Sequence, residues 1–446
     1  MAIENPPSVK NRGWSVALSG LGINLALGVL YTWSLFKPAI AKMPDWKASQ
    51  LNDPYALCCL VFAFTMIVAG RFQDKLGPRL TATIGGVLVG AGMLLLSSSQ
   101  SYGIWLLGFG VLVGLGLGFG YSAATPAALK WFPPAKTGLI AGLVVAGFGL
   151  APVYLAPTAD YLLTHYTLQK SMFILGVAFL LIVCGLSQLL VNPPPGFSTA
   201  APGAAKPPVA GATPGEMLRS PVFYLLWLIY VIGAGAGLMV IGSLSGMAKA
   251  SMGAHAFVAV AIMAIGNAGG RIVAGILSDK IGRRQTLMLV LGLQAALMFI
   301  AIPVTASVPA AAPKPAVAAP AASPAATATA SAPAPAPAPA SAPTSSGIGL
   351  ALIVVLVATM IGFNYGANLA LFPSFAKDFW GLKGFGLNYG VLFTACGVGG
   401  FIFPKVQQVL TANSGGSFQT SFIAAGSVLV IGAVLTLFIR PPKAAA

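Results

Sequence analysis

The sequence predicts an all-α membrane protein of twelve transmembrane helices, arranged as two six-helix halves. The prediction rests on a very apolar composition, on twelve apolar stretches of spanning length, and on one loop motif that occurs once in each half. Of the 446 residues, 57% are hydrophobic and only 7% are charged, whereas soluble domains carry about 25% charged residues. Most of the surface must therefore be solvated by lipid.

The spans follow from the thickness of the bilayer. A membrane-crossing helix needs roughly 20 mainly apolar residues, and helices close their own backbone hydrogen bonds in lipid. None of the apolar stretches alternates at period two, which excludes the strands of a β-barrel. The stretches begin near residues 13, 53, 80, 103, 137, 168, 221, 254, 284, 347, 385 and 416.

The N-terminal segment predicts no signal peptide, and the cysteines predict no disulfide framework. Residues 1–12 are polar and run into a long first span without a small-residue cleavage site, so we expect no cleaved signal peptide. All four cysteines (Cys58, Cys59, Cys184 and Cys396) fall inside predicted spans. They therefore predict no exterior disulfide framework.

The basic residues are distributed unevenly between the two sides. Of the 24 Lys and Arg residues, sixteen fall on one set of connecting segments, seven fall on the other, and Arg271 lies inside a span. By the positive-inside rule, the first set and both termini are cytoplasmic. We expect a multi-pass protein of the cell inner membrane. The net charge of +16 then reports topology, and the expected partner is the lipid bilayer rather than nucleic acid.

Two segments of low complexity divide the chain. Residues 193–217 are rich in Pro, Gly and Ala and separate spans six and seven, which predicts halves at 1–192 and 218–446 joined by a cytoplasmic linker. Residues 306–345 are almost wholly Ala, Pro, Ser and Thr. Such a composition cannot form a packed core, so we expect a disordered loop on the outer side and assign it no function.

The repeated motif lies on two short inside loops. GRFQDKLGPR (70–79) and GILSDKIGRR (275–284) both fit G-x-x-x-D-x-x-G-x-R at equivalent places in the two halves. A duplicated motif in a six-plus-six chain indicates an internal repeat.

The residue types of this motif predict a gate. The carboxylates of Asp74 and Asp279 stand near helix ends and basic side chains, so ion pairs can form in one conformation and break in another; the basic candidates are Arg79, Arg283 and Arg284. In each copy, the second glycine (Gly77, Gly282) permits a tight turn and the first (Gly70, Gly275) permits close helix approach.

The pair of loops resembles the signature of the major facilitator superfamily. Further segments resemble the branch that contains monocarboxylate transporters, oxalate/formate exchangers and bacterial lactate transporters; they are residues 11–36, 130–152, 215–227, 363–374 and 388–390. The resemblance implies the major facilitator fold and transport by alternating access. In the segment 130–152, Gly138, Gly142, Gly147 and Gly149 are predicted to form a face where another helix packs closely.

One charge does not fit the loops. Arg271 precedes the inside Asp279 by eight residues, which places it roughly 12 Å deep at 1.5 Å per residue. An arginine near mid-membrane usually marks a substrate pathway, and its planar fork matches a carboxylate. A structural arginine neutralised by a buried acid is the alternative. The resemblance agrees with an anchor, since a span-eight Arg binds the carboxylate in that family.

The neighbours of Arg271 predict the kind of anion. Asn267 stands one turn away from Arg271. The resemblance implies that animal monocarboxylate transporters have an Asp at this place, which pairs with the Arg and handles the proton. The Asn267 amide cannot titrate, but it can donate a hydrogen bond to the substrate or to a neighbouring helix. Cys396 aligns with a second cation of the oxalate-exchanging relatives. With Phe393 and Leu369 beside it, this position favours one carboxylate with a small apolar tail over a dicarboxylate.

Other candidates are weaker, and each also has a plain structural reading. Tyr31, Tyr121, Tyr365 and Tyr389 could offer hydroxyl groups and an apolar wall, or simply pack between helices. Candidates for the polar lining are Asn364 and Asn368. Candidates for proton coupling are Lys37, Asp160 and His255, all near outer helix ends, where a lysine can also snorkel and a histidine can be incidental.

Together these features predict a secondary transporter of a small, lactate-like monocarboxylate, working by proton symport as a monomer. Anion exchange of the oxalate/formate type is the alternative, and a non-transporting membrane sensor is a remote one. We expect no enzyme and no cofactor, because the spans contain no metal-ligand spacing, phosphate-binding loop or acid pair.

Overall fold

The computed structural model describes residues 11–44, 46–47, 50–194, 197, 211–252, 256–306, 345–414 and 417–442. Within these ranges all regular secondary structure is helical, and twelve helices are long and apolar enough to cross a membrane. Each of the twelve begins within three residues of its predicted start. The predicted fold class is confirmed.

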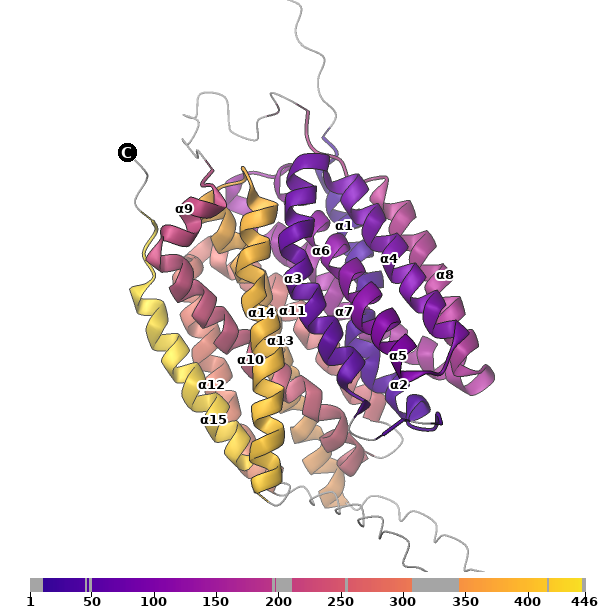
Figure 1. Ribbon diagram of the computed structural model, residues 1–446. Helices are drawn as coiled ribbons and strands as arrows, with labels where there is room; N and C mark the ends of the chain where they lie inside the picture. The colour runs from indigo at the N-terminus through magenta and orange to yellow at the C-terminus, as the bar shows by residue number, and fades with distance from the viewer. Residues whose placement is uncertain are drawn as a thin grey trace, which may run out of the picture.

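The first six spans form one bundle, coloured indigo to magenta in Figure 1. They are α1 (Gly13–Leu27) with η1 (Gly28–Thr32), α3 (Asp53–Leu76), α4 (Pro78–Ser98), α5 (Tyr102–Trp105) with η3 (Leu106–Val113) and α6 (Gly114–Leu129), α7 (Thr137–His165) and α8 (Leu168–Ser187). Two short helices complete this half: α2 (Trp33–Ile40) after η1, and η4 (Pro134–Lys136) before α7.

The last six spans form the second bundle, on the other side of the molecule in Figure 1. They are α10 (Pro221–Met252), α11 (Ala256–Ile281), α12 (Arg283–Ala306), α13 (Ser345–Trp380), α14 (Phe385–Asn413) and α15 (Gln419–Leu435) with η6 (Thr436–Phe438). The end of the bundle that carries the two repeated loops is called the loop end below.

Part of the predicted linker is helical. A short helix, α9 (Pro214–Arg219), lies inside the predicted range 193–217 and begins with a capping box. Thr213 Oγ1 accepts the backbone N–H of Glu216 at 3.3 Å, and the Glu216 carboxylate accepts that of Thr213 at 2.6 Å. These bonds lower the pKa of Glu216. The predicted outer loop is 306–345, and all of it except its first and last residues lies outside the described ranges.

Two symmetry-related helix pairs join the halves. Helix α3 packs along α14, and α7 packs along α11 (Figure 1). Small residues make this approach possible, since a Cβ on Gly275 would collide with the backbone oxygen of Gly138, and one on Gly70 with that of Gly386. The predicted role of the first motif glycines in close approach is confirmed.

The second motif glycines form the turns. Gly77 has a φ of 85° and Gly282 a φ of 96°, a left-handed region that glycine adopts without strain. In the segment that contains α7, Gly138, Gly142 and Gly149 face α11 as predicted. Gly147 instead faces α1, where its Cβ would meet the backbone of Leu21 and Leu25, because helical geometry turns it away from the other three.

Span one changes its helix type on the way through the membrane. The α-helical geometry of α1 gives way at Gly28 to the 3₁₀ turn η1, which ends at Thr32 and is followed by α2. A Cβ on Gly28 would collide with the α7 backbone at Phe148, so α7 lies directly against this break. The break places Tyr31 beside the centre of the molecule.

Candidate functional site

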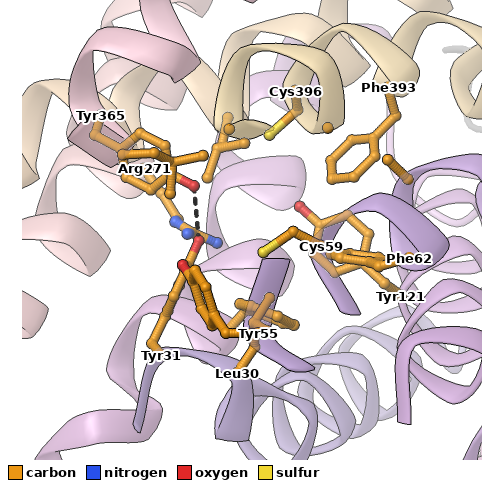
Figure 2. Close-up of a pocket in the computed structure, with 16 residues that line it drawn as sticks. Leu30, Tyr31, Tyr55, Cys59, Phe62, Tyr121, Arg271, Tyr365, Phe393 and Cys396 are labelled. Atoms are coloured by element: carbon orange, nitrogen blue, oxygen red, sulfur yellow. Dashed lines mark hydrogen bonds between the residues drawn. The ribbon is translucent and has the colours of Figure 1, made fainter. Parts of the chain in front are cut away.

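A cavity lies between the two halves, near the middle of the spans. Sixteen residues line it (Figure 2). Its walls come from both halves: Leu30, Tyr31, Tyr55, Cys59, Phe62, Ala63, Tyr121 and Phe148 from the first, and Leu238, Arg271, Tyr365, Leu369, Phe393, Cys396, Gly397 and Gly400 from the second.

Arg271 on α11 supplies the charge of this cavity. Its side chain is 0% exposed, Nε donates to Asn267 Oδ1 at 2.9 Å, and Nη1 donates to the main-chain carbonyl of Val145 on α7. Nη2 has no hydrogen-bond partner within the described residues. A guanidinium has five N–H donors, so this arginine is held by two groups and still presents unused donors.

No described acid compensates this charge. Arg271 is the one charged residue among the sixteen that line the cavity. The acids of the described ranges lie toward the ends of the spans: Asp53, Asp74, Asp160, Glu216, Asp279 and Asp378. An unpaired buried cation is costly, which makes the cavity a site for an anion.

Two tyrosines close the cavity beside the guanidinium. Tyr31 on η1 and Tyr365 on α13 share a hydrogen bond of 2.9 Å between their hydroxyl groups, which joins the two halves (Figure 2). Away from Arg271 the wall is aromatic. The rings of Phe62, Tyr121 and Phe393 pack with centroids 5.2 to 5.5 Å apart, so a tail opposite the carboxylate would meet apolar surface.

Seven of the eight predicted substrate residues line this single cavity: Tyr31, Tyr121, Arg271, Tyr365, Leu369, Phe393 and Cys396. The eighth, Asn267, does not line it and instead holds the Arg271 Nε. Tyr389 is also absent from the lining, as are Asn364 and Asn368, whose amides donate to Met360 O and Gln294 Oε1 within the second half.

Sequence reasoning missed the α3 wall. Tyr55, Cys59 and Phe62 recur at spacings of four and three residues, which places them on one helix face. That pattern was visible in the sequence. However, apolar residues surround it on every side of the helix, so nothing indicated that this face turns toward a cavity.

Two of the three proton-coupling candidates, Lys37 and Asp160, do not line the cavity. Lys37 lies on α2, half-buried, and Asp160 lies exposed near the end of α7; neither is among the lining residues. His255 lies outside the described residues.

The two motif aspartates bind helix starts of the opposite half. Asp279 on α11 accepts the backbone N–H groups of Gly138 and Leu139 at 2.9 and 3.0 Å. Asp74 on α3 accepts those of Gly386 and Leu387 at 3.0 Å each. A helix N-terminus attracts negative charge, so both carboxylates join the two halves at the loop end.

The basic partners differ between the two loops. Arg283 pairs with Asp279 at 2.6 Å and with Asp378 at 2.9 Å. Asp74, Arg79 and Arg284 make no ion pair within the described residues, so Asp74 acts through the helix start rather than through an ion pair. Near Asp74, burial lowers the pKa of Lys130, while the negative charge of that carboxyl opposes the shift.

Comparison with known proteins decides the family. The sequence profile of the Major Facilitator Superfamily matches residues 14–348. The chain belongs to this superfamily. The E. coli fucose:proton symporter FucP, solved in an outward conformation, shares the fold, with a TM-score of 0.63 and 14% identity over 95% of this chain and 98% of that one.

Two relatives place the chain in a branch of this superfamily. It is 24% identical to the oxalate:formate antiporter of Oxalobacter formigenes, over 97% of this chain and 92% of the relative. It is 27% identical to human monocarboxylate transporter 11, over 60% of this chain and 56% of the relative. The branch is that of the monocarboxylate transporters and oxalate/formate antiporters, as predicted, and the chain is a multi-pass membrane transporter of this superfamily.

Proposed function

We propose that this chain transports a small monocarboxylate with an apolar tail, such as lactate, and acts as a carrier rather than an enzyme. The observation that carries the proposal is Arg271, which is buried in the cavity between the halves with Nη2 unpartnered within the described residues. A carboxylate accepts hydrogen bonds from such a fork bidentately. The names of the relatives, an oxalate:formate antiporter and a monocarboxylate transporter, agree with an organic anion.

The number of positively charged residues in the cavity lining favours a substrate with one carboxylate. Arg271 is the single charged residue of the lining. Cys396, which also lines the cavity, aligns with the second cation of the oxalate-exchanging relatives. A second carboxylate placed against Phe62, Tyr121 and Phe393 would be desolvated without a partner, which costs several kcal/mol. The aromatic wall therefore selects for a tail without charge.

The test is uptake of labelled lactate into proteoliposomes, with Arg271→Lys as the variant and Arg219→Lys on the exposed helix α9 as the matched control. Losing the fork that holds the carboxylate should lower lactate affinity at least about 30-fold, equivalent to about 2 kcal/mol. The control should transport like the wild type. An Arg271→Lys protein with wild-type affinity would refute the anchor, and a wild type that moves no monocarboxylate would refute the function.

Two processes could drive the transport of the monocarboxylate: proton symport and anion exchange. Proton symport follows from the family resemblance and remains our first proposal. Anion exchange is favoured by one observation: the lining holds no carboxyl group or histidine that could carry a proton. In addition, the empty cavity keeps a bare positive charge, whereas the loaded cavity is neutral. Reorientation should therefore be easier with an anion bound.

The two coupling modes separate in one experiment. An inward proton gradient should stimulate lactate uptake into otherwise empty liposomes if the protein is a symporter. For an exchanger, uptake should ignore the gradient and require unlabelled anion inside. We expect the protein to sit in the cell inner membrane with the loop end cytoplasmic, and to work as a monomer.

A further inference from the structure

A groove runs between α12 and α15 on the outer surface of the second half. The two helices pack side by side at one edge of the molecule in Figure 1. The residues that line the groove are all apolar; they include Met288, Gly292 and Phe299 on α12, and Val430, Val434 and Leu437 on α15. All six are exposed on the protein surface. In a membrane-spanning chain, this surface meets lipid tails.

Small residues make the groove hollow. On α12 its lining includes Gly292, Ala295 and Ala296. A Cβ added to Gly292 would lie in open space, with no atom of another helix within 4 Å. The helices α4 and α8 of the first half, which correspond to α12 and α15, pack more closely. By the register of the repeated motif, Val87 stands at the place of Gly292, and a Cβ on Gly90 nearby would lie 2.8 Å from Leu180 of α8.

The length of the groove matches one leaflet of the bilayer. Met288 and Phe299 are eleven residues apart, which is roughly 16 Å along a helix at 1.5 Å per residue. The hydrocarbon core of a bilayer is about 30 Å thick, so one leaflet contributes about 15 Å. The groove therefore has the length and the lining of a site for a single acyl chain.

Two arginines stand at the loop-end mouth of the groove. Helix α12 begins at the loop end and α15 ends there (Figure 1), so Met288 and Leu437 are the lining residues nearest to that end. Arg284 precedes Met288 by four residues, on the same face of α12, and Arg440 follows Leu437 by three. The turn η6, which contains Leu437, packs against α12. Both arginines are thus brought to the same end of the groove.

The backbone fixes the place of Arg440 after α15 ends. Ile439 is buried, and its N–H donates to the carbonyl oxygen of Thr436 at 3.1 Å. Pro441 follows Arg440 and favours an extended backbone at the residue before it. Arg284 and Arg440 are both exposed, and neither pairs with an acid within the described residues. Two positive charges therefore stand at the end of the groove where lipid headgroups lie.

We propose that this groove binds an anionic phospholipid, with one acyl chain between α12 and α15 and the phosphate held by Arg284 and Arg440. The apolar lining suits the acyl chain, and the guanidinium fork matches a phosphate bidentately. Basic sites between transmembrane helices at a membrane surface bind anionic headgroups. The site lies outside the cavity between the halves, so the inference does not depend on which solute is carried.

Charge favours an anionic lipid over other occupants of the groove. In a symmetric dimer each copy offers the same surface, so a contact centred on the groove would bring two pairs of arginines together. These like charges would repel one another. A lipid without net charge fills an apolar groove equally well but leaves the two arginines uncompensated.

The test titrates dioleoyl phosphatidylglycerol into the purified full-length protein in detergent and counts bound lipids by native mass spectrometry. Dioleoyl phosphatidylcholine is the comparison lipid, since it has the same acyl chains and no net charge. One variant combines Arg284→Gln with Arg440→Gln and removes both charges, and a second, Gly292→Leu, fills the groove. Arg79→Gln is the matched control, because Arg79 is exposed and is the repeat counterpart of Arg284, but residues 187–194 after α8 contain no Lys or Arg.

The wild type should bind phosphatidylglycerol at least about tenfold more tightly than phosphatidylcholine. The double arginine variant should lose about 30-fold in affinity for phosphatidylglycerol, since each basic residue near a membrane surface contributes about fivefold. Its preference between the two lipids should vanish. Gly292→Leu should weaken the binding of both lipids, because the acyl chain loses its place, and Arg79→Gln should match the wild type. Without added lipid, the thermal midpoint of every variant should match that of the wild type, since all four positions are exposed.

Three outcomes would overturn the inference. Equal affinity of the wild type for the two lipids, or an unchanged affinity of the double arginine variant, would show that the arginines do not read the headgroup. Wild-type lipid binding by Gly292→Leu would show that the acyl chain does not occupy the groove. A dimeric wild type that Gly292→Leu converts to monomers would assign the groove to a second copy of the chain. None of these measurements involves transport, so each outcome leaves the proposed function untouched.

Discussion

Asp279→Asn is the sharpest test of how the loop end is held closed. The carboxylate accepts two backbone N–H bonds of 2.9 and 3.0 Å from α7. An Asn amide has one acceptor oxygen, so one of the two bonds is lost, at roughly 1.5–3 kcal/mol for a hydrogen bond to a charged group. The other bond becomes neutral, which costs about 1 kcal/mol more. The helix terminus adds about 0.3–1 kcal/mol. Together these differences amount to about 3–5 kcal/mol.

The amide has nearly the size of the carboxyl group, so the loss comes from the charge and from one acceptor atom, not from packing. Arg283 keeps a second partner in Asp378 at 2.9 Å and is not left unpaired. A change of about 3–5 kcal/mol should shift the balance between closed and open loop ends by about 160- to 5,000-fold toward the open form.

The assay is a distance measurement between nitroxides at Lys136 and Lys280, which are both exposed and lie on opposite halves at the loop end. All four native cysteines are first replaced by alanine. The parent protein should give one short distance, and Asp279→Asn should add a longer one. Asp74→Asn is the matched variant, since its carboxylate makes the same two backbone bonds without an ion pair. An unchanged distance distribution in Asp279→Asn would refute the reasoning.

Three further predictions concern the cavity and the interface between the halves. Cys396→Lys should supply a partner for a second carboxylate and raise oxalate uptake relative to lactate about tenfold or more in competition assays; an unchanged ratio would count against the one-cation argument. Gly275→Ala should cost about 1–3 kcal/mol through collision with the α7 backbone and lower the thermal midpoint, whereas Gly185→Ala, with no atom within 4 Å of its Cβ, should not. Tyr31→Phe and Tyr365→Phe should each remove the same 2.9 Å bond, so a double-mutant cycle of thermal stability should give a coupling of about 1 kcal/mol; additive effects would show that the bond contributes nothing.

The sequence predicts those parts of the structure that depend on hydrophobicity and on special backbone residues. Span starts follow from the length of apolar stretches, and the positive φ of Gly77 and Gly282 follows from the motif. The depth of Arg271 could be counted from Asp279 along one helix. These features depend on short stretches of chain, so a single sequence is sufficient for them.

Features that depend on packing could not be predicted in the same way. The 3₁₀ turn that positions Tyr31 and the π-helical segment Leu106–Val113 are set by neighbouring helices. The contact of Asp279 with the α7 helix start joins residues about 140 positions apart. The sequence places Asn267 beside Arg271, but it does not tell whether the Asn267 amide binds the arginine or the solute. Both would form a hydrogen bond with the amide at the same place.

The two loop-end contacts together form an isologous interface within a single chain. Each half gives a carboxylate to the other and receives one at the second and third residues of a helix, 138–139 in one half and 386–387 in the other. In a symmetric dimer the same surface serves both subunits, and here a duplicated chain keeps that relation after its halves have diverged. Each half therefore retains both parts of the contact, so two fragments made separately would carry everything needed to recognise one another at this end.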